Sequence, residues 1–126
     1  MLKQESKQIK QFVAEGVDPG VIWTEACVAA KLAVEDFVQR HGEPLYCGFA
    51  NVRIRPAKGK FVTFLKRVGV GSLGYRGGYS VSYYAIMEDH QWCHTQSMDI
   101  KEHGCEAFAE VLRKYGMDAH MESRAD

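Results

Sequence analysis

The sequence predicts an α+β protein in which two N-terminal helices precede a ferredoxin-like β-α-β-β-α-β unit with a four-stranded antiparallel sheet. Apolar residues recur at helical spacing up to residue 42, and the pattern changes to period two at residue 45. Helix-like and strand-like segments then alternate to the C-terminus. With 126 residues, 46% of them hydrophobic, the chain is expected to form a single domain over 1–126. Residues 1–42 are its helical extension and residues 45–126 its α+β core.

Two helical patterns occupy the extension. An apolar stripe among charged and amide residues predicts a short amphipathic helix over residues 2–15. Asp18 and Pro19 then supply an N-cap and a first helical position, and Gly42 ends this second helix. Its apolar positions cover more than half of its circumference, which is more than one core contact requires. The second helix is therefore expected to be sandwiched or to meet a second subunit.

The core begins with a strand over residues 45–55, where apolar and polar residues alternate until Pro56. Residues 58–68 return to helical spacing, and Gly69 provides the stop. Five glycines within residues 69–78 predict a loop.

The second half of the core is expected to contain a hairpin, a helix and a last strand. Residues 79–87 are rich in Tyr, Val and Ile, and residues 92–100 follow a polar turn, so the two segments read as paired strands. Residues 101–115 carry one apolar face, which predicts a helix. Residues 119–124 alternate again and predict the final strand.

Composition limits the classes of function. Sixteen Lys and Arg residues balance sixteen Asp and Glu residues, so no global field draws the protein to nucleic acid or to an anionic membrane. The chain has no run long enough for a membrane span and no signal-peptide core, which predicts a cytosolic protein. Its four cysteines lack CxxC spacing and are expected to be reduced thiols.

Pleat alternation predicts a polar sheet face opposite the face that the helices cover. Guanidinium groups bind phosphate bidentately and aromatic rings stack on bases, so this face suits a phosphorylated planar ligand. Alternatively, Arg53 and Arg55 pair with Asp99 and Glu122 across strands, under a cover formed by the leading helices. The face is expected to carry Phe49, Asn51, Arg53, Arg55, Thr95, Ser97, Asp99, His120, Glu122 and Arg124, with Tyr79, Tyr83 and Tyr84 nearby.

Two further segments are candidates for anion binding. Arg53, Arg55, Lys58 and Lys60 surround a strand end and a helix N-terminus, where orphan N–H groups and the helix dipole favour an anion. The alternative is a pair of solvated lysines and a snorkelling arginine. The glycine-rich segment 69–78 matches G-x-G-x-x-G but lies between a helix and a strand, the reverse of the dinucleotide-binding context.

That glycine-rich segment has two possible roles. Tyr75 and Arg76 sit on it and could close over a ligand as a lid, or the segment is only a flexible connection. Elsewhere, the segment 58–64 has part of an RNA-recognition pattern but lies on a predicted helix.

No motif indicates catalysis. The spacing of His90, Cys93, His94, His103 and Cys105 matches no known zinc site, and buried unactivated thiols are the commoner reading of Cys47 and Cys93. No nucleophile elbow, HExxH or Walker pattern is present. The sequence therefore predicts no catalytic residue, metal or cofactor.

Three segments are informative together: residues 46–61 (YCGFANVRIRPAKGKF), residues 76–79 (RGGY), and the stretch from 96–102 to 123–126. They resemble a family of small bacteriophage and prophage proteins, and the resemblance covers about two thirds of the chain. The size, the lack of catalytic motifs and the arginine-bearing sheet also resemble phage proteins that sequester nucleotide signals of host immunity, such as the Thoeris anti-defence sponges. The resemblance implies that arginines, among them Arg76 and Arg124, grip phosphates while Phe49, Tyr79 or Tyr84 stacks on a base.

The resulting hypothesis is a homo-oligomeric, non-catalytic protein of the host cytoplasm that sequesters a cyclic nucleotide or an ADP-ribose type signal. The alternatives are a single-stranded nucleic-acid-binding module and a host-protein-binding inhibitor, whereas a phosphodiesterase or thiol enzyme lacks support. The candidate ligand-binding residues are Phe49, Arg53, Arg55, Lys58, Lys60, Tyr75, Arg76, Tyr79, Tyr84 and Arg124.

Overall fold

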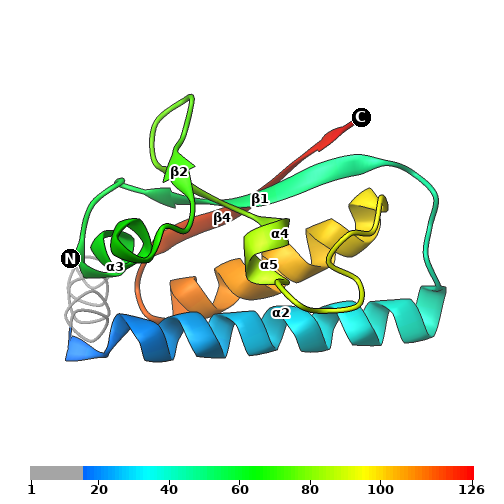
Figure 1. The fold of residues 1–126 in the computed structure, drawn as a ribbon, viewed down its shortest axis with the longest axis horizontal. Coiled ribbons are helices and arrows are strands. Elements are labelled where there is room, and N and C mark those ends of the chain that lie inside the picture. The colour runs from blue at the N-terminus through cyan, green and yellow to red at the C-terminus, as the bar shows by residue number, and fades with distance from the viewer. Residues whose placement is uncertain (1–15) are drawn as a thin grey trace, which may run out of the picture.

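The computed structural model of the protein describes residues 16–126 (Figure 1). The helix expected over residues 2–15 lies outside the described residues. In chain order, the elements are α2 (Pro19–His41), β1 (Gly48–Arg55), α3 (Lys60–Val68), β2 (Ser72–Leu73), β3 (Tyr79–Ser82), α4 (Tyr83–Ile86), α5 (Met98–Lys114) and β4 (Asp118–Ala125). The α+β class and the single four-stranded antiparallel sheet are confirmed.

The long helix α2 has the ends that its sequence predicts. The Asp18 carboxylate accepts a hydrogen bond from the Gly20 N–H at 2.8 Å, and Pro19 occupies the first helical position. After His41, Gly42 takes a positive φ of 69° and its N–H reaches the Val38 carbonyl.

The strands lie in the order β2-β3-β1-β4, and all neighbours are antiparallel. The long strands β1 and β4 pair along their full length, and β3 pairs with the other side of β1. In this register Asn51 lies between Ser82 and Glu122, and Phe49 lies opposite Arg124. Polar side chains of three strands therefore share one face of the sheet.

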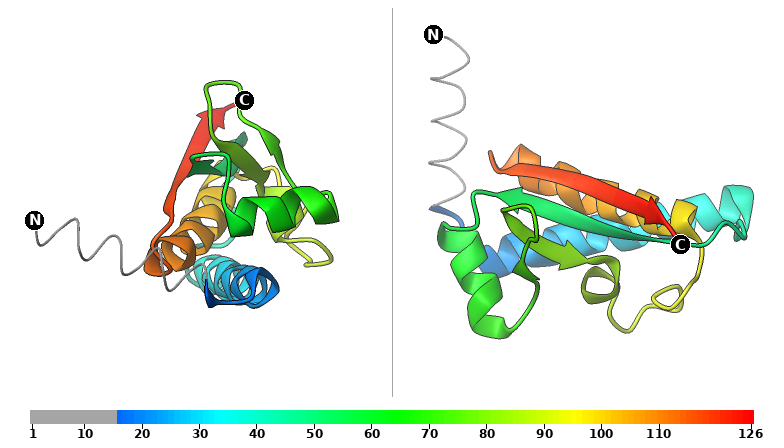
Figure 2. Two further views of the ribbon diagram at one scale, coloured as in Figure 1. Left: turned by 90° about the vertical axis from the view of Figure 1, so that its left-hand side faces the viewer. Right: turned by 90° about the horizontal axis from the view of Figure 1, so that it is seen from above.

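The helices form two layers on the other face of the sheet. Figures 1 and 2 show α5 against the sheet and α2 against the far side of α5. Gly104 permits close contact at this second interface, because a Cβ there would lie 2.9 Å from Val34 Cγ2. The Trp23 and Phe108 rings also meet between α2 and α5, with centroids 5.5 Å apart. As predicted, Ala50, Val52 and Ile54 of β1 are buried beneath the helices.

Of two expected strands, the segment 79–87 is a strand only over Tyr79–Ser82, and the segment 92–100 forms no strand. The hairpin predicted over 79–87 and 92–100 is absent, since β3 stops at Ser82 and the chain turns into α4. The Ser82 hydroxyl accepts from the Ala85 N–H at 3.2 Å, and the Ser97 hydroxyl accepts from the Ile100 N–H at 3.4 Å. These N-caps start a helix at both places, so capping prevails over the strand propensity of the flanking residues.

The hairpin instead joins β2, inside the expected glycine-rich loop, to β3. The observed order therefore does not match the expected ferredoxin-like unit element by element. As a consequence, Thr95 and Ser97 precede α5 and Asp99 lies in its first turn, so none of the three belongs to the open sheet face.

The alternative in which the leading helices cover the arginine-bearing face does not hold for α2, which lies on the opposite side of the sheet (Figure 1). No helix within residues 16–126 is both long enough and apolar enough to cross a membrane.

Candidate ligand-binding groove

A groove of about 860 Å³ lies on the open face of the sheet. Its charged lining residues are three arginines and one glutamate, so the groove is locally cationic in a chain of zero formal charge. Three aromatic side chains contribute to the same lining. The groove is lined by Phe49, Ala50, Asn51, Arg53, Tyr75, Arg76, Ser80, Ser82, Tyr84, Glu122, Ser123 and Arg124.

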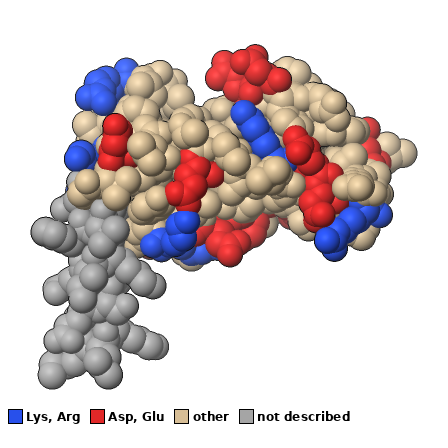
Figure 3. All heavy atoms as spheres, turned by 90° about the horizontal axis from the view of Figure 1, so that it is seen from below, with Lys and Arg blue, Asp and Glu red and all other residues tan. Residues whose placement is uncertain are grey.

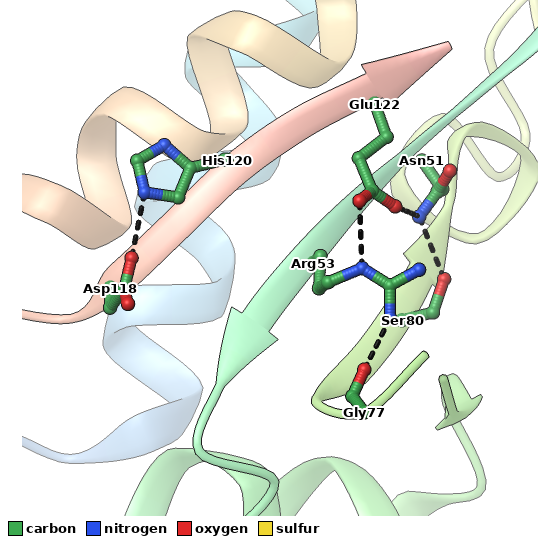
Figure 4. Close-up of polar contacts among 7 residues, drawn as sticks. All are labelled: Asn51, Arg53, Gly77, Ser80, Asp118, His120 and Glu122. Atoms are coloured by element: carbon green, nitrogen blue, oxygen red, sulfur yellow. Dashed lines mark hydrogen bonds and ion pairs between the residues drawn. The ribbon is translucent and has the colours of Figure 1, made fainter. Parts of the chain in front are cut away.

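At one end of the groove, the polar side chains are hydrogen-bonded to one another (Figure 4). Arg53 Nε donates to Glu122 Oε2 at 2.8 Å, and a second guanidinium nitrogen donates to the Gly77 carbonyl. Asn51 Nδ2 donates to Glu122 Oε1 at 3.3 Å and to the Ser80 hydroxyl at 2.9 Å. These bonds join β1, β3, β4 and the loop between β2 and β3.

The charges in this network stabilise one another. The hydrogen bond from Arg53 lowers the pKa of the Glu122 carboxyl, and the same bond raises the pKa of Arg53. The Arg53 side chain is only 12% exposed. The predicted cross-strand pairing of Arg53 with Glu122 is thus present, whereas Arg55 is exposed and Asp99 lies on α5.

The other end of the groove is built from aromatic rings and cations without a carboxylate partner among residues 16–126. Arg124 Cζ lies 5.4 Å from the centroid of the Phe49 ring. Lys101 Nζ lies 5.1 Å from the centroids of both Phe49 and Tyr84. This ammonium donates to the Gly48 carbonyl at 2.8 Å and to the Tyr84 hydroxyl oxygen at 3.1 Å.

A glycine-rich turn carries Tyr75 and Arg76 to the groove. The Gly74 N–H donates to the Gly78 carbonyl at 2.8 Å, which closes the turn between β2 and β3. Gly78 has a positive φ of 73°, and an added Cβ would approach the Ile54 carbonyl at 2.9 Å, so a larger residue does not fit. Tyr75 is 99% exposed at the tip. Tyr75 and Arg76 thus line the groove, and closure of this turn over a ligand stays a prediction.

The structure brings six of the ten predicted ligand-binding residues together: Phe49, Arg53, Tyr75, Arg76, Tyr84 and Arg124. Arg55, Lys58 and Lys60 are exposed outside the groove lining, toward the start of α3. Tyr79 lies on the covered face with 3% exposure, and its hydroxyl donates to the Val70 carbonyl. The Tyr79 ring therefore cannot stack on a ligand in the groove.

Lys101 was not among the predicted binding residues. Lys101 occupies a position on the apolar stripe of α5, four residues before Cys105 and seven before Phe108, both of which are fully buried. A lysine at such a position is the signal that could have identified it. Asn51 was predicted to lie on this polar face but was not among the ten ligand-binding residues, and Ser80 and Ser82 were not singled out.

Residues 16–126 contain no group of three or more His, Cys, Asp or Glu side chains that could hold a metal ion. Burial raises the pKa of the Cys93 and Cys105 thiols, so both are protonated near neutral pH. Neither thiol has the low pKa of a nucleophilic cysteine.

Three comparisons bear on identity. No protein-family model, curated protein or solved structure matches the chain. Membership of a phage family accordingly stays a prediction.

Proposed function

We propose that the protein binds a small phosphorylated molecule with a planar group, of nucleotide type, in the groove on the open sheet face. The observation that supports this proposal is the lining: three arginines and one glutamate, together with three aromatic rings, in a chain of zero net charge. Phosphate and a flat ring are the two ligand groups that such a surface recognises.

Each part of the lining has a chemical role in this proposal. Arg76 and Arg124 are exposed, and no carboxylate is bonded to either within the described residues, so their guanidinium forks are available to phosphate oxygens. Tyr75, the most exposed of the three aromatic residues in the lining, offers a ring face to the planar group. The carboxylate of Glu122 can accept hydrogen bonds from amino or hydroxyl groups of the ligand.

The groove supports binding without turnover. Arg53 and Glu122 bond to each other, and the groove has no histidine or cysteine among its lining residues. We propose that the protein sequesters its ligand, and the resemblance to phage proteins suggests a cyclic nucleotide or an ADP-ribose type signal of host defence, held in the host cytoplasm.

We also propose a homo-oligomer through α2. Val21, Val28 and Leu32 are between 50% and 61% exposed, whereas the other side of α2 packs on α5. Figure 3 shows acidic and basic side chains interspersed on the face viewed from below, so that face carries no single-sign field. Sedimentation of the wild type and of Leu32→Glu tests this proposal, because a lower mass for the variant is expected.

A thermal-shift screen of the full chain tests the proposed binding. The ligands are AMP, ADP, 3′,5′-cyclic AMP, ADP-ribose, and short single-stranded DNA and RNA. A ligand at 100 times its dissociation constant adds about 2.7 kcal/mol, which raises the unfolding midpoint by several degrees. We expect a mononucleotide or ADP-ribose to stabilise the protein and to be recovered unchanged by chromatography.

Other outcomes of the screen contradict the proposal. Stabilisation by oligonucleotides alone favours a single-stranded nucleic-acid module. A cleaved product favours an enzyme, and no shift with any ligand favours a surface that binds a host protein.

A further inference from the structure

Lys101 is the only charged side chain that is buried among residues 16–126, with 1% exposure. Burial of an ammonium group without a carboxylate is costly, because the charge loses its hydration. Here the Gly48 carbonyl, the Tyr84 hydroxyl oxygen and the faces of two aromatic rings replace that hydration in part. The result is a fixed positive charge directly behind one end of the groove.

The two ends of the groove therefore differ in charge. Arg53 is neutralised by the Glu122 carboxylate at 2.8 Å, whereas Lys101 and Arg124 have no bonded carboxylate within the described residues. Arg124 follows Glu122 by two residues on β4, which separates them by ~6.8 Å along the strand. Arg76 lies next to Gly77 on the turn at the Arg53 end, where it is exposed. A ligand that spans the groove therefore meets a balanced pair on the sheet at one end and the charges of Lys101 and Arg124, unpaired among the described residues, at the other.

Lys101 also orients the Tyr84 hydroxyl. An ammonium group has donors and no acceptor, so the Tyr84 oxygen must accept the 3.1 Å hydrogen bond from Lys101 Nζ. The Tyr84 O–H bond consequently points away from Lys101. Because Tyr84 lines the groove and is 40% exposed, its proton is available to a ligand oxygen.

We infer that the anionic group of the ligand binds at the Phe49–Tyr84–Arg124 end, with Lys101 as the buried positioning residue. The part of the ligand that carries N–H or O–H donors then faces Glu122, which accepts one bond at each oxygen and has further lone pairs. The reverse orientation places an anion beside the Glu122 carboxylate, where like charges repel. This inference rests on the proposed function and adds the orientation in which the ligand lies in the groove.

Inorganic pyrophosphate is a probe for the anion subsite alone, and adenosine is the matched neutral probe. Both are titrated into ¹⁵N-labelled full-length protein while amide shifts are recorded. Pyrophosphate is expected to shift the amides of Phe49, Tyr84 and Arg124 more than those of Arg53 and Gly77. Adenosine is expected to shift the amides around Glu122.

Three variants separate positioning from folding. Tyr84→Phe keeps the ring and removes the hydroxyl, and Arg124→Gln removes an exposed charge, so each is expected to weaken pyrophosphate binding about tenfold or more. Lys101→Met keeps most of the aliphatic stem and is expected to weaken pyrophosphate binding while leaving adenosine binding unchanged. Arg55→Gln, on the same sheet face but outside the groove lining, is the matched control and is expected to bind as wild type does.

The titration distinguishes this inference from the proposed function. If pyrophosphate binds at the Arg124 end but no nucleotide stabilises the protein, the anion subsite holds and the nucleotide proposal fails. The inference is overturned if pyrophosphate does not bind, if it shifts mainly Arg53 and Gly77, or if Tyr84→Phe and Arg124→Gln both bind as wild type does. If Lys101→Met does not fold, pyrophosphate binding by Tyr84→Phe and Arg124→Gln still tests the inference.

Discussion

The residues of β1 alternate between two faces, and the two faces differ in chemistry. Ala50, Val52 and Ile54 are buried against the helices, whereas Phe49 and Asn51 point into the groove on the opposite face. Burial of apolar area stabilises the first face, and only hydrogen bonds, ion pairs and ring contacts order the second. Stability is therefore expected to depend on the covered face and binding on the open face.

Arg53 departs from this division between a stabilising face and a binding face. It lies on the open face and lines the groove, yet its guanidinium is committed to Glu122 and to the Gly77 carbonyl. Arg124 lies on the same face with a ring contact and no ion pair among the described residues. Two arginines that look equivalent in the sequence are thus expected to differ, one acting in stability and the other in binding.

The largest expected effect on stability is on the covered face. Phe108 is fully buried and packs against Trp23, so Phe108→Ala is expected to lower the free energy of unfolding by about 3–5 kcal/mol. Urea denaturation followed by circular dichroism measures this loss. A decrease below about 1 kcal/mol would show that α5 and α2 do not form the main core.

The next largest effect on stability is expected at the end of the groove that holds the Arg53–Glu122 ion pair. Arg53→Gln is expected to lower the free energy of unfolding by about 1–2 kcal/mol, because it removes a charged hydrogen bond to a carboxylate that is itself 40% exposed. Arg55→Gln on the same strand should change it by less than about 0.5 kcal/mol. Equal losses in the two variants, measured by urea denaturation, would mean that the Arg53 network is not structural.

A smaller effect is expected in the dependence of stability on pH. The folded-state pKa of Glu122 is lowered by Arg53, so the stabilisation is complete above the unfolded-state carboxyl pKa of about 4.3 and is lost as pH falls through the folded-state value. Glu122→Gln should flatten this decline. The measurement is the unfolding midpoint in urea between about pH 6 and pH 2.5.

Glu25 is the control for this pH dependence. Hydrogen bonds from Lys114 and Tyr115 lower the pKa of its carboxyl, so Glu25→Gln should flatten the same acid limb. Because Glu25 lies on α2, away from the groove, this variant should leave ligand binding unchanged. A change of binding in Glu25→Gln alone would contradict the separation of the two faces.

The smallest effect on stability is expected at the two groove arginines that have no bonded carboxylate among the described residues. The double variant Arg76→Gln/Arg124→Gln alters two exposed side chains and should change the free energy of unfolding by less than about 0.5 kcal/mol. It should nevertheless abolish the thermal shift that a nucleotide produces, since Arg124 belongs to the anion subsite and Arg76 is the other groove arginine without a bonded carboxylate within residues 16–126. A retained shift would place the phosphate elsewhere.

The sequence predicts those parts of the fold that local signals determine. Asp18, Pro19 and Gly42 mark α2 closely, and alternation in β1 correctly separates the buried Val52 from the groove residue Asn51. The hairpin was assigned wrongly because Val, Tyr and Ile suit a strand and a buried helix alike, and the decisive caps are single serines.

The site was predicted only in part, because its composition depends on pairing between distant residues. Alternation placed Arg53 and Arg124 on one face, but Tyr79, which was expected near that face as a stacking residue, is buried on the other. The proximity of Lys101 to Tyr84 depends on how α5 packs against α4, which residue spacing alone does not determine. Ion pairs such as Arg53–Glu122 likewise follow from strand register.

An amide chemical-shift map of the full chain with ADP tests most directly whether the open face binds a phosphorylated planar ligand. We predict that the shifted amides belong to groove residues on β1, β4 and the glycine-rich turn, with Phe49, Arg76 and Arg124 among them. Shifts confined to Lys58 and Lys60 at α3, or to the exposed side of α2, would contradict it.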